Sequence, residues 1–122
     1  ILGDSGSGKS DLALRLIDSG ATLISDDISI CRKNSNNIYL YCPPEIKGLL
    51  EVREIGIITV PFVERIKLRL VVNLRSKNNE RFPKDNSFRI LGIKIPLISI
   101  EGKNSSAVAK IKVKLNEIRE TI

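Results

Sequence analysis

The chain has 122 residues, of which 42% are hydrophobic and 28% charged, and its formal net charge is +6. This length and composition favour a soluble globular protein with a single domain over residues 1–122. Apolar runs stay well short of the ~20 residues of a membrane span, and three Phe and two Tyr offer few base-stacking positions. We therefore expect neither a membrane nor a nucleic acid as partner. The absence of a signal-peptide pattern predicts a cytoplasmic protein.

The first third of the chain combines one helix with short strands. The expected elements are a helix over 10–19, a short apolar strand over 21–25 and a hairpin with strands over 28–32 and 38–42. The helix carries an apolar stripe, and Gly20 stands where a C-terminal cap belongs. Asp26 and Asp27 close the short strand, whereas Ile1 and Leu2 are typical of the end of an earlier, incomplete one.

The remainder of the chain is richer in strand than in helix. The expected elements are extended segments over 49–52 and 56–60, a strand over 65–74, a mobile or functional polar loop over 75–88, short strands over 90–100 and a helix over 105–122. We expect Gly92 and Pro96 to interrupt the strands of 90–100. Ser105 or Ser106 is expected to cap the last helix. Together these elements predict an α/β fold.

A glycine-rich phosphate loop opens the chain. Its eight residues fit the pattern G-x-x-x-x-G-K-S/T, and they are Gly3, Asp4, Ser5, Gly6, Ser7, Gly8, Lys9 and Ser10. Glycines let successive backbone N–H groups turn toward phosphate oxygens. A lysine at the seventh position offers an ammonium to the β and γ phosphates, and a serine after it can ligate Mg²⁺. The helix that follows directs its positive end at the same oxygens. The alternative is a glycine turn before a helix.

Acidic residues follow the phosphate loop at two places. Asp26 and Asp27 end the strand after the loop helix, where a carboxylate can hold Mg²⁺ or orient a nucleophile. Successive side chains alternate across a strand, so one of the two can face a site while the other has a structural role. Glu51 and Arg53 share one strand face and could ligate a metal and neutralise a phosphate. A simple turn at the aspartates and an exposed ion pair between Glu51 and Arg53 are the alternatives.

Three stretches together resemble a known family. GDSGSGKS (3–10), GATLISDD (20–27) and LLEVREIGII (49–58) resemble the catalytic domain of the bacterial HPr kinase/phosphorylase, and most closely its short single-domain alphaproteobacterial form. Later stretches, including ERFP at 80–83, fit the same form. The resemblance implies a P-loop-containing mixed sheet with few helices, similar to phosphoenolpyruvate carboxykinase. It also implies transfer of phosphate from ATP to a serine of the phosphocarrier HPr, and removal of that phosphate by inorganic phosphate.

The same resemblance implies a role for each motif residue. Lys9 would hold the β phosphate and the transferred group, whereas Ser10 and Glu51 would ligate Mg²⁺. Asp27 would accept the proton of the attacking serine and return it in the reverse reaction. Arg81 matches the catalytic arginine of the family and would neutralise developing charge. The implied cofactors are ATP and Mg²⁺, and the implied partners are HPr and further copies of the chain, which form a hexamer in the family.

Two departures from the family pattern keep other functions open. The glycine that usually follows Glu-x-Arg is Glu54 here, and the sequence has no histidine, although the family places a catalytic one upstream of the loop. One alternative is a nucleotide-binding regulatory module that does not catalyse transfer. The other is a P-loop kinase that acts on a small-molecule acceptor.

Overall fold

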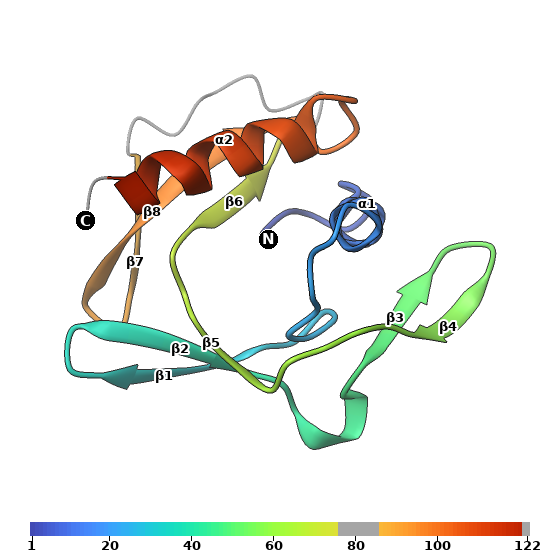
Figure 1. The fold of residues 1–122 in the computed structure, drawn as a ribbon, viewed down its shortest axis with the longest axis horizontal. Coiled ribbons are helices and arrows are strands. Elements are labelled where there is room, and N and C mark those ends of the chain that lie inside the picture. The colour runs from blue at the N-terminus through green and yellow to red at the C-terminus, as the bar shows by residue number, and fades with distance from the viewer. Residues whose placement is uncertain (76–85, 121–122) are drawn as a thin grey trace. The chain divides into compact units, whose positions relative to one another are not determined.

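The protein is described here from a computed structural model, which describes residues 1–75 and 86–120. The chain forms two compact units, which are described separately: residues 1–12 with 69–122, and residues 13–68. The described elements are α1 (Lys9–Asp18), β1 (Ile30–Asn34), β2 (Asn37–Tyr41), the 3₁₀ turn η1 (Pro44–Ile46), β3 (Leu49–Val52), β4 (Gly56–Thr59), β5 (Arg65–Lys67), β6 (Val71–Leu74), β7 (Ser87–Ile90), β8 (Ile93–Ile100) and α2 (Ala107–Glu120) (Figure 1). The predicted mixed α/β fold with few helices is confirmed.

The first unit is built on the sheet β6-β8-β7, in which β6 and β8 are parallel and β7 is antiparallel to β8. Leu2 extends the sheet beyond β6, because its N–H donates to Val72 O at 2.7 Å and its carbonyl accepts from Leu74 N at 2.8 Å. Leu2, β6 and β8 therefore run in one direction, and the segments that follow them leave from the same edge of the sheet. This edge carries the phosphate loop.

The helix α2 follows β8 and lies beside it in the first unit (Figure 1). The buried apolar side chains of this unit outside α1 come from both strands and helix: Val71, Val72, Leu74, Ile95, Leu97, Ile100, Ala107 and Ile111. Ser106 precedes the helix as predicted, but its hydroxyl donates to Asn104 Oδ1 at 2.7 Å. The Asn104 carboxamide also accepts from Ser106 N at 2.9 Å, so it organises the turn into α2.

Pro96 does not interrupt its strand, contrary to the prediction. β8 continues through Pro96, which pairs with Ser87 of β7. The pairing with β6 begins one residue later, at Leu97. Pro96 has no N–H to donate. Because Pro96 lies before the stretch that pairs with β6, no hydrogen bond to β6 is lost there. Leu91 and Gly92, with φ of 49° and 80°, form the turn between β7 and β8.

The predicted strand over 65–74 is wrong as a single element. Its first part is β5, which pairs with β2 in the second unit, and its last part is β6, which pairs with β8 in the first unit. Residues 68–70 between them belong to no strand. Alternation of apolar and polar residues reports an extended backbone, and it does not report the strand with which each part pairs.

The helix α1 begins one residue earlier than predicted and ends at a glycine, as expected. Gly20 has a φ of 109°, its N–H donates to Ile17 O at 3.0 Å, and Ala21 N donates to Leu16 O at 3.0 Å. This pair of hydrogen bonds is the Schellman motif, which needs a left-handed residue at the position of Gly20. None of the described helices is both long and apolar enough to span a bilayer.

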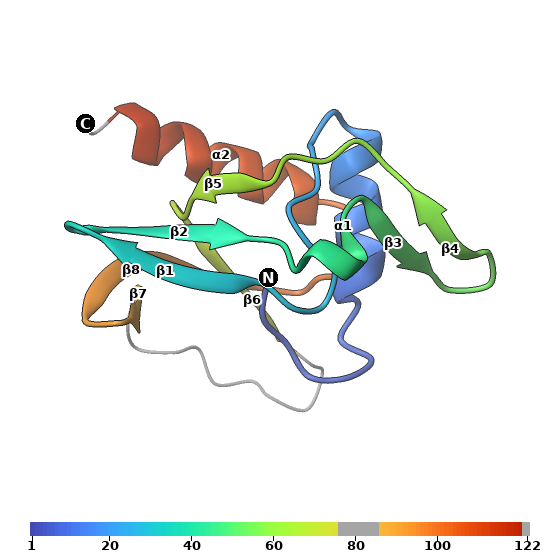
Figure 2. The same cartoon turned by 90° about the horizontal axis from the view of Figure 1, so that it is seen from below.

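The second unit contains two antiparallel sheets, β1-β2-β5 and β3-β4 (Figure 2). The predicted hairpin is confirmed, with a tighter turn than expected because Asn34 pairs with Asn37. The strand predicted over 21–25 is wrong. Leu23 forms only an isolated parallel bridge, in which its N–H donates to Pro61 O and its carbonyl accepts from Val63 N. Most of the predicted loop over 75–88 lies outside the described residues, whereas residues 87 and 88 belong to β7.

Candidate phosphate-binding site

The loop over residues 3–10 connects the strand-like Leu2 to α1 at the sheet edge of the first unit. Ser7 N donates to Asp4 O at 3.0 Å, which closes a turn within the loop. Gly6 and Gly8 have φ values of 81° and 97°. Such angles strain a residue with a side chain, and they turn N–H groups toward the concave side of a loop. The backbone of the loop is thus suited to hold the oxygens of a phosphate chain.

Gly3 is required for a different reason, which is close packing. A Cβ at this position would lie 2.5 Å from Ser7 Oγ and 3.2 Å from Leu74 Cβ. Any side chain on Gly3 would therefore push the loop away from β6. Ser7 is buried, and its Oγ has no hydrogen-bond partner within the described part of the chain. An acceptor or donor that enters the loop could satisfy this hydroxyl.

Lys9 reaches back across the loop that it closes. Its Nζ donates to Gly3 O at 2.8 Å, and the residue is half-buried. The Lys9 side chain thus reaches from the end of the loop back to its first residue. The backbone N–H groups and this ammonium are donors, which suits an anionic ligand.

A second cation lies beside the loop, and no local sequence pattern indicates it. Side-chain atoms of Lys103 lie close to Gly8: Cγ is 3.5 Å and Cε 3.9 Å from the position that a Cβ on Gly8 would take. Lys103 belongs to the turn after β8, in which Asn104 N donates to Glu101 O at 3.1 Å. Only the parallel pairing of β8 with β6 brings this turn to the edge that carries the loop. Gly102, in the same turn, packs against Leu74.

The residues proposed for Mg²⁺ do not form a ready-made cage. Ser10 is exposed in the first turn of α1, and Glu51 is exposed on β3. No group of three or more His, Cys, Asp or Glu side chains that could hold a metal occurs in residues 1–75 and 86–120. Mg²⁺ commonly keeps several waters and binds through one or two protein ligands plus substrate phosphates. Ser10 in the first unit and Glu51 in the second are each exposed and could each supply one such ligand.

In the second unit, Asp26 and Asp27 occupy different environments. The Asp26 carboxylate accepts a hydrogen bond from Glu51 N at 3.0 Å, which ties the segment to β3. Asp26 O accepts from Ile28 N at 2.7 Å, and Asp27 between them has a φ of 65°. A three-residue turn with a positive central φ is a strained form of γ-turn. The Ser25 hydroxyl adds a hydrogen bond to Ile28 O. Asp26 thus has a structural contact, whereas Asp27 is exposed on a strained turn.

The predicted site residues therefore fall into three groups. Gly3 to Ser10 lie together in the first unit with Lys103 beside them. Asp26, Asp27 and Glu51 lie together in the second unit. Arg81 lies outside the described residues. The cavity of about 500 Å³ between β8 and α2 is lined by neither the loop nor Lys103, so it does not belong to this site.

Glu54 occupies a backbone position that favours glycine. It lies in the turn between β3 and β4, where Ile55 N donates to Val52 O at 3.0 Å, and its φ is 74°. Left-handed backbone costs a residue with a Cβ about 1–2 kcal/mol. This turn geometry supplies a physical reason for a glycine at this place.

Replacement of Glu54 with Gly should therefore raise the free energy of unfolding by about 1 kcal/mol. The neighbouring substitution Arg53→Gly is the matched control. Arg53 has no positive φ, so glycine there should lower the free energy of unfolding by about 0.5–1 kcal/mol. Urea denaturation followed by circular dichroism measures both. A destabilising Glu54→Gly would show that the turn is not strained.

Comparison with known proteins gives consistent results. The family model described as HPr Serine kinase C-terminal domain matches residues 1–120. HPr kinase/phosphorylase from Ralstonia nicotianae is 33% identical, over 98% of this chain and 41% of that protein. The same enzyme from Cupriavidus metallidurans is 34% identical, over 98% of this chain and 42% of that protein. The solved structure of the Hpr(Ser) kinase/phosphatase from Coxiella burnetii superposes with a TM-score of 0.83 at 26% identity, over 98% of this chain and 82% of that one. The chain thus spans about two fifths of the length of the curated relatives.

Proposed function

This chain belongs to the HPr serine kinase C-terminal domain family, and on that premise we propose that it is an enzyme that transfers a phosphoryl group from ATP to a serine of HPr. The observation that carries this function is the phosphate loop, with its two left-handed glycines and with Lys9 and Lys103 beside it. Phosphoryl transfer depends on positioning and charge neutralisation more than on covalent chemistry. A donor-lined loop with two cations supplies both.

Each residue of the site has a role in this proposal. Lys9 exchanges its hydrogen bond to Gly3 O for the β phosphate and the transferred group. Ser10 and Glu51 would hold Mg²⁺, which would neutralise phosphate charge when it is bound with the nucleotide. Asp27 accepts the proton of the attacking serine, and its exposed carboxylate on a tied-down turn suits a base that must reach an acceptor protein. Arg81 neutralises charge that develops on the transferred group.

The reverse reaction uses the same groups. In this reaction inorganic phosphate attacks the phosphorus of the phosphoserine and forms pyrophosphate, and the protonated Asp27 can return its proton to the departing serine oxygen. We extend the proposal to this phosphorylase activity. We further propose that the protein acts in the cytoplasm, as the proposed acceptor implies, and that it forms a homo-oligomer, as the resemblance to the family implies.

A nucleotide-binding module without transfer is the second candidate, and the observation that favours it is Glu54. This carboxylate stands where the family has glycine, and it adds negative charge to the segment that carries Glu51. A transfer assay separates the candidates: the purified chain is incubated with radiolabelled ATP, Mg²⁺ and either HPr or a panel of small metabolites. Label on HPr supports the proposed enzyme. Label on a metabolite indicates a small-molecule kinase, and bound nucleotide without label on either indicates the regulatory module.

Lys103 yields a prediction that the sequence motif does not make. Lys103→Gln should weaken ATP binding about threefold to tenfold, because it removes an exposed cation beside the loop, which contributes about 1 kcal/mol. Lys94→Gln is the control, because Lys94 is an exposed cation of the same unit. It lies on β8, opposite Arg89 of β7 in the strand pairing. Calorimetric titration with ATP measures both. Equal affinities for the two variants would remove Lys103 from the site.

A further inference from the structure

One face of the sheet β1-β2-β5 combines arginines and tyrosines. Tyr39 pairs with Arg32 on one side and with Lys67 on the other, and Tyr41 pairs with Arg65. Directly paired residues point to the same side of a sheet, so these side chains share a face. We call Arg32, Tyr39, Tyr41, Arg65 and Lys67 the basic tyrosine face. It lies within the second unit and contains no residue of the phosphate loop.

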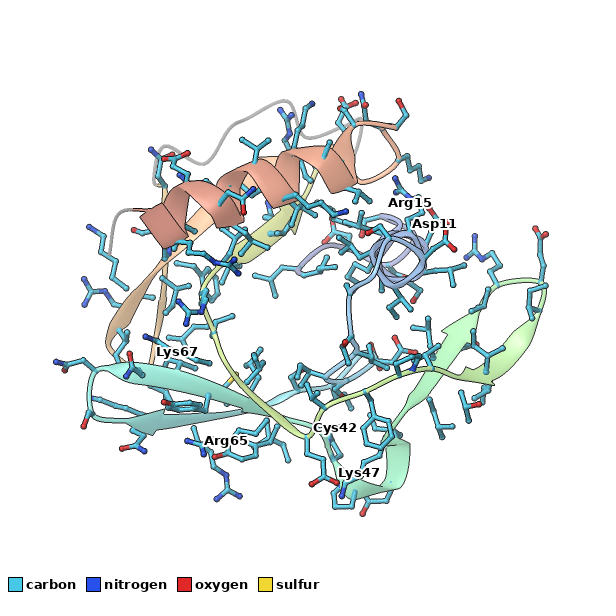
Figure 3. The ribbon with its side chains drawn as sticks, viewed as in Figure 1. Asp11, Arg15, Cys42, Lys47, Arg65 and Lys67 are labelled. Atoms are coloured by element: carbon cyan, nitrogen blue, oxygen red, sulfur yellow. The ribbon has the colours of Figure 1, made fainter. Side chains whose placement is uncertain are left out.

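Both arginines of this face stack on the tyrosine diagonal to them. The guanidinium of Arg32 lies 5.4 Å from the centre of the Tyr41 ring, and that of Arg65 lies 4.2 Å from the centre of the Tyr39 ring. Arg65 and Lys67 both come from β5 (Figure 3). A guanidinium held over a ring keeps the N–H groups at its edge available, so it is ordered before a ligand arrives.

The charge of this face is uniformly positive. Its described positions on the three strands are Ile30, Arg32, Asn34, Asn37, Tyr39, Tyr41, Arg65 and Lys67. None of these described positions carries a carboxylate, and Arg32 and Arg65 are exposed. By contrast, the exposed Lys47 in the same unit is paired with Glu64 at 2.9 Å. The basic tyrosine face is thus an ordered cationic surface without an internal counter-charge on its strands.

We propose that the basic tyrosine face docks an acidic segment of a partner protein. Carboxylates accept two parallel N–H bonds from a guanidinium edge, and this geometry suits the two stacked arginines. β1 and β5 are separated by β2, so the arginines lie about 10 Å apart across the sheet, which is about three residues of an extended chain. A nucleic acid strand fits less well, because its bases need open aromatic rings and both tyrosine rings already stack with a guanidinium.

The test uses the whole chain and a fluorescein-labelled oligoglutamate peptide of about ten residues, which in extended form spans more than the ~10 Å between the arginines. Fluorescence anisotropy at low salt measures its affinity. Arg32→Gln and Arg65→Gln should each weaken binding about threefold to tenfold. Arg65→Lys should also weaken it, because lysine keeps the charge and loses the planar fork. Melting temperatures near that of the unaltered chain show that the variants are folded.

Lys33→Gln is the matched control for Arg32→Gln. Lys33 is the next residue of β1 and points to the opposite face, so the variant loses the same charge from the same strand. Its affinity for the peptide should stay within about twofold of the unaltered chain. An equal loss for Lys33→Gln and Arg32→Gln would overturn the proposal, because only net charge would then matter. Tighter, Arg32-dependent binding of single-stranded oligothymidylate would overturn it in favour of a nucleic acid.

Discussion

Replacement of Asp27 with Asn is expected to lower the rate of phosphoryl transfer to HPr about 10²–10⁴-fold, the usual contribution of a general base. Asparagine has nearly the same shape, so the turn between Asp26 O and Ile28 N can persist. It cannot accept the serine proton, which is lost as the serine oxygen gains the phosphoryl group. The affinity for ATP should change little, because the base acts at the transition state and not in nucleotide binding.

Asp26→Asn is the informative control for this prediction. The Asp26 carboxylate accepts from Glu51 N, and loss of its charge should cost about 1 kcal/mol of stability with a far smaller effect on rate. Single-turnover kinetics with HPr, together with thermal unfolding, separates the two outcomes. A full transfer rate for Asp27→Asn with complete loss for Asp26→Asn would assign the base to the other carboxylate.

Replacement of Lys9 with Ala is expected to weaken ATP binding about 10- to 100-fold, since hydrogen bonds to charged groups contribute about 1.5–3 kcal/mol. The Lys9 ammonium already lies against the loop at Gly3 O. Its removal takes away the cation that reaches across the loop, and leaves the loop backbone and Lys103 to bind phosphate. Transfer to HPr should fall at least in proportion.

Calorimetric titration with Mg-ATP measures the loss of affinity. Lys112→Ala is the control for net charge, because Lys112 is an exposed lysine on α2. The control should bind ATP within about twofold of the unaltered chain, as expected for a solvated charge away from the loop. Unchanged affinity in Lys9→Ala would show that residues 3–10 do not hold the triphosphate.

The phosphate loop and the end of α1 could be anticipated because their determinants are local. Eight consecutive residues define the loop, and a single residue, Gly20, ends the helix in a Schellman motif. Such features depend on backbone angles that few residue types adopt. The hairpin of β1 and β2 was likewise predictable from two apolar runs around a polar turn.

The features that could not be anticipated depend on pairing between distant segments. The alternating run over 65–74 gave no sign that β5 and β6 join different sheets. Lys103 reaches Gly8 only because β8 lies parallel to β6. The sequence also left open how Asp26 and Asp27 differ, and the structure shows that the Asp26 carboxylate accepts a hydrogen bond from Glu51 N.

The most direct test of the proposed activity is intact-mass spectrometry of HPr after incubation with the chain and Mg-ATP. The expected result is one added phosphate on a serine of HPr, formed by the unaltered chain and strongly reduced with Lys9→Ala. The phosphate should also be removed when inorganic phosphate replaces ATP. If HPr stays unmodified while the chain binds Mg-ATP with full affinity, the chain is a nucleotide-binding protein and not an HPr kinase.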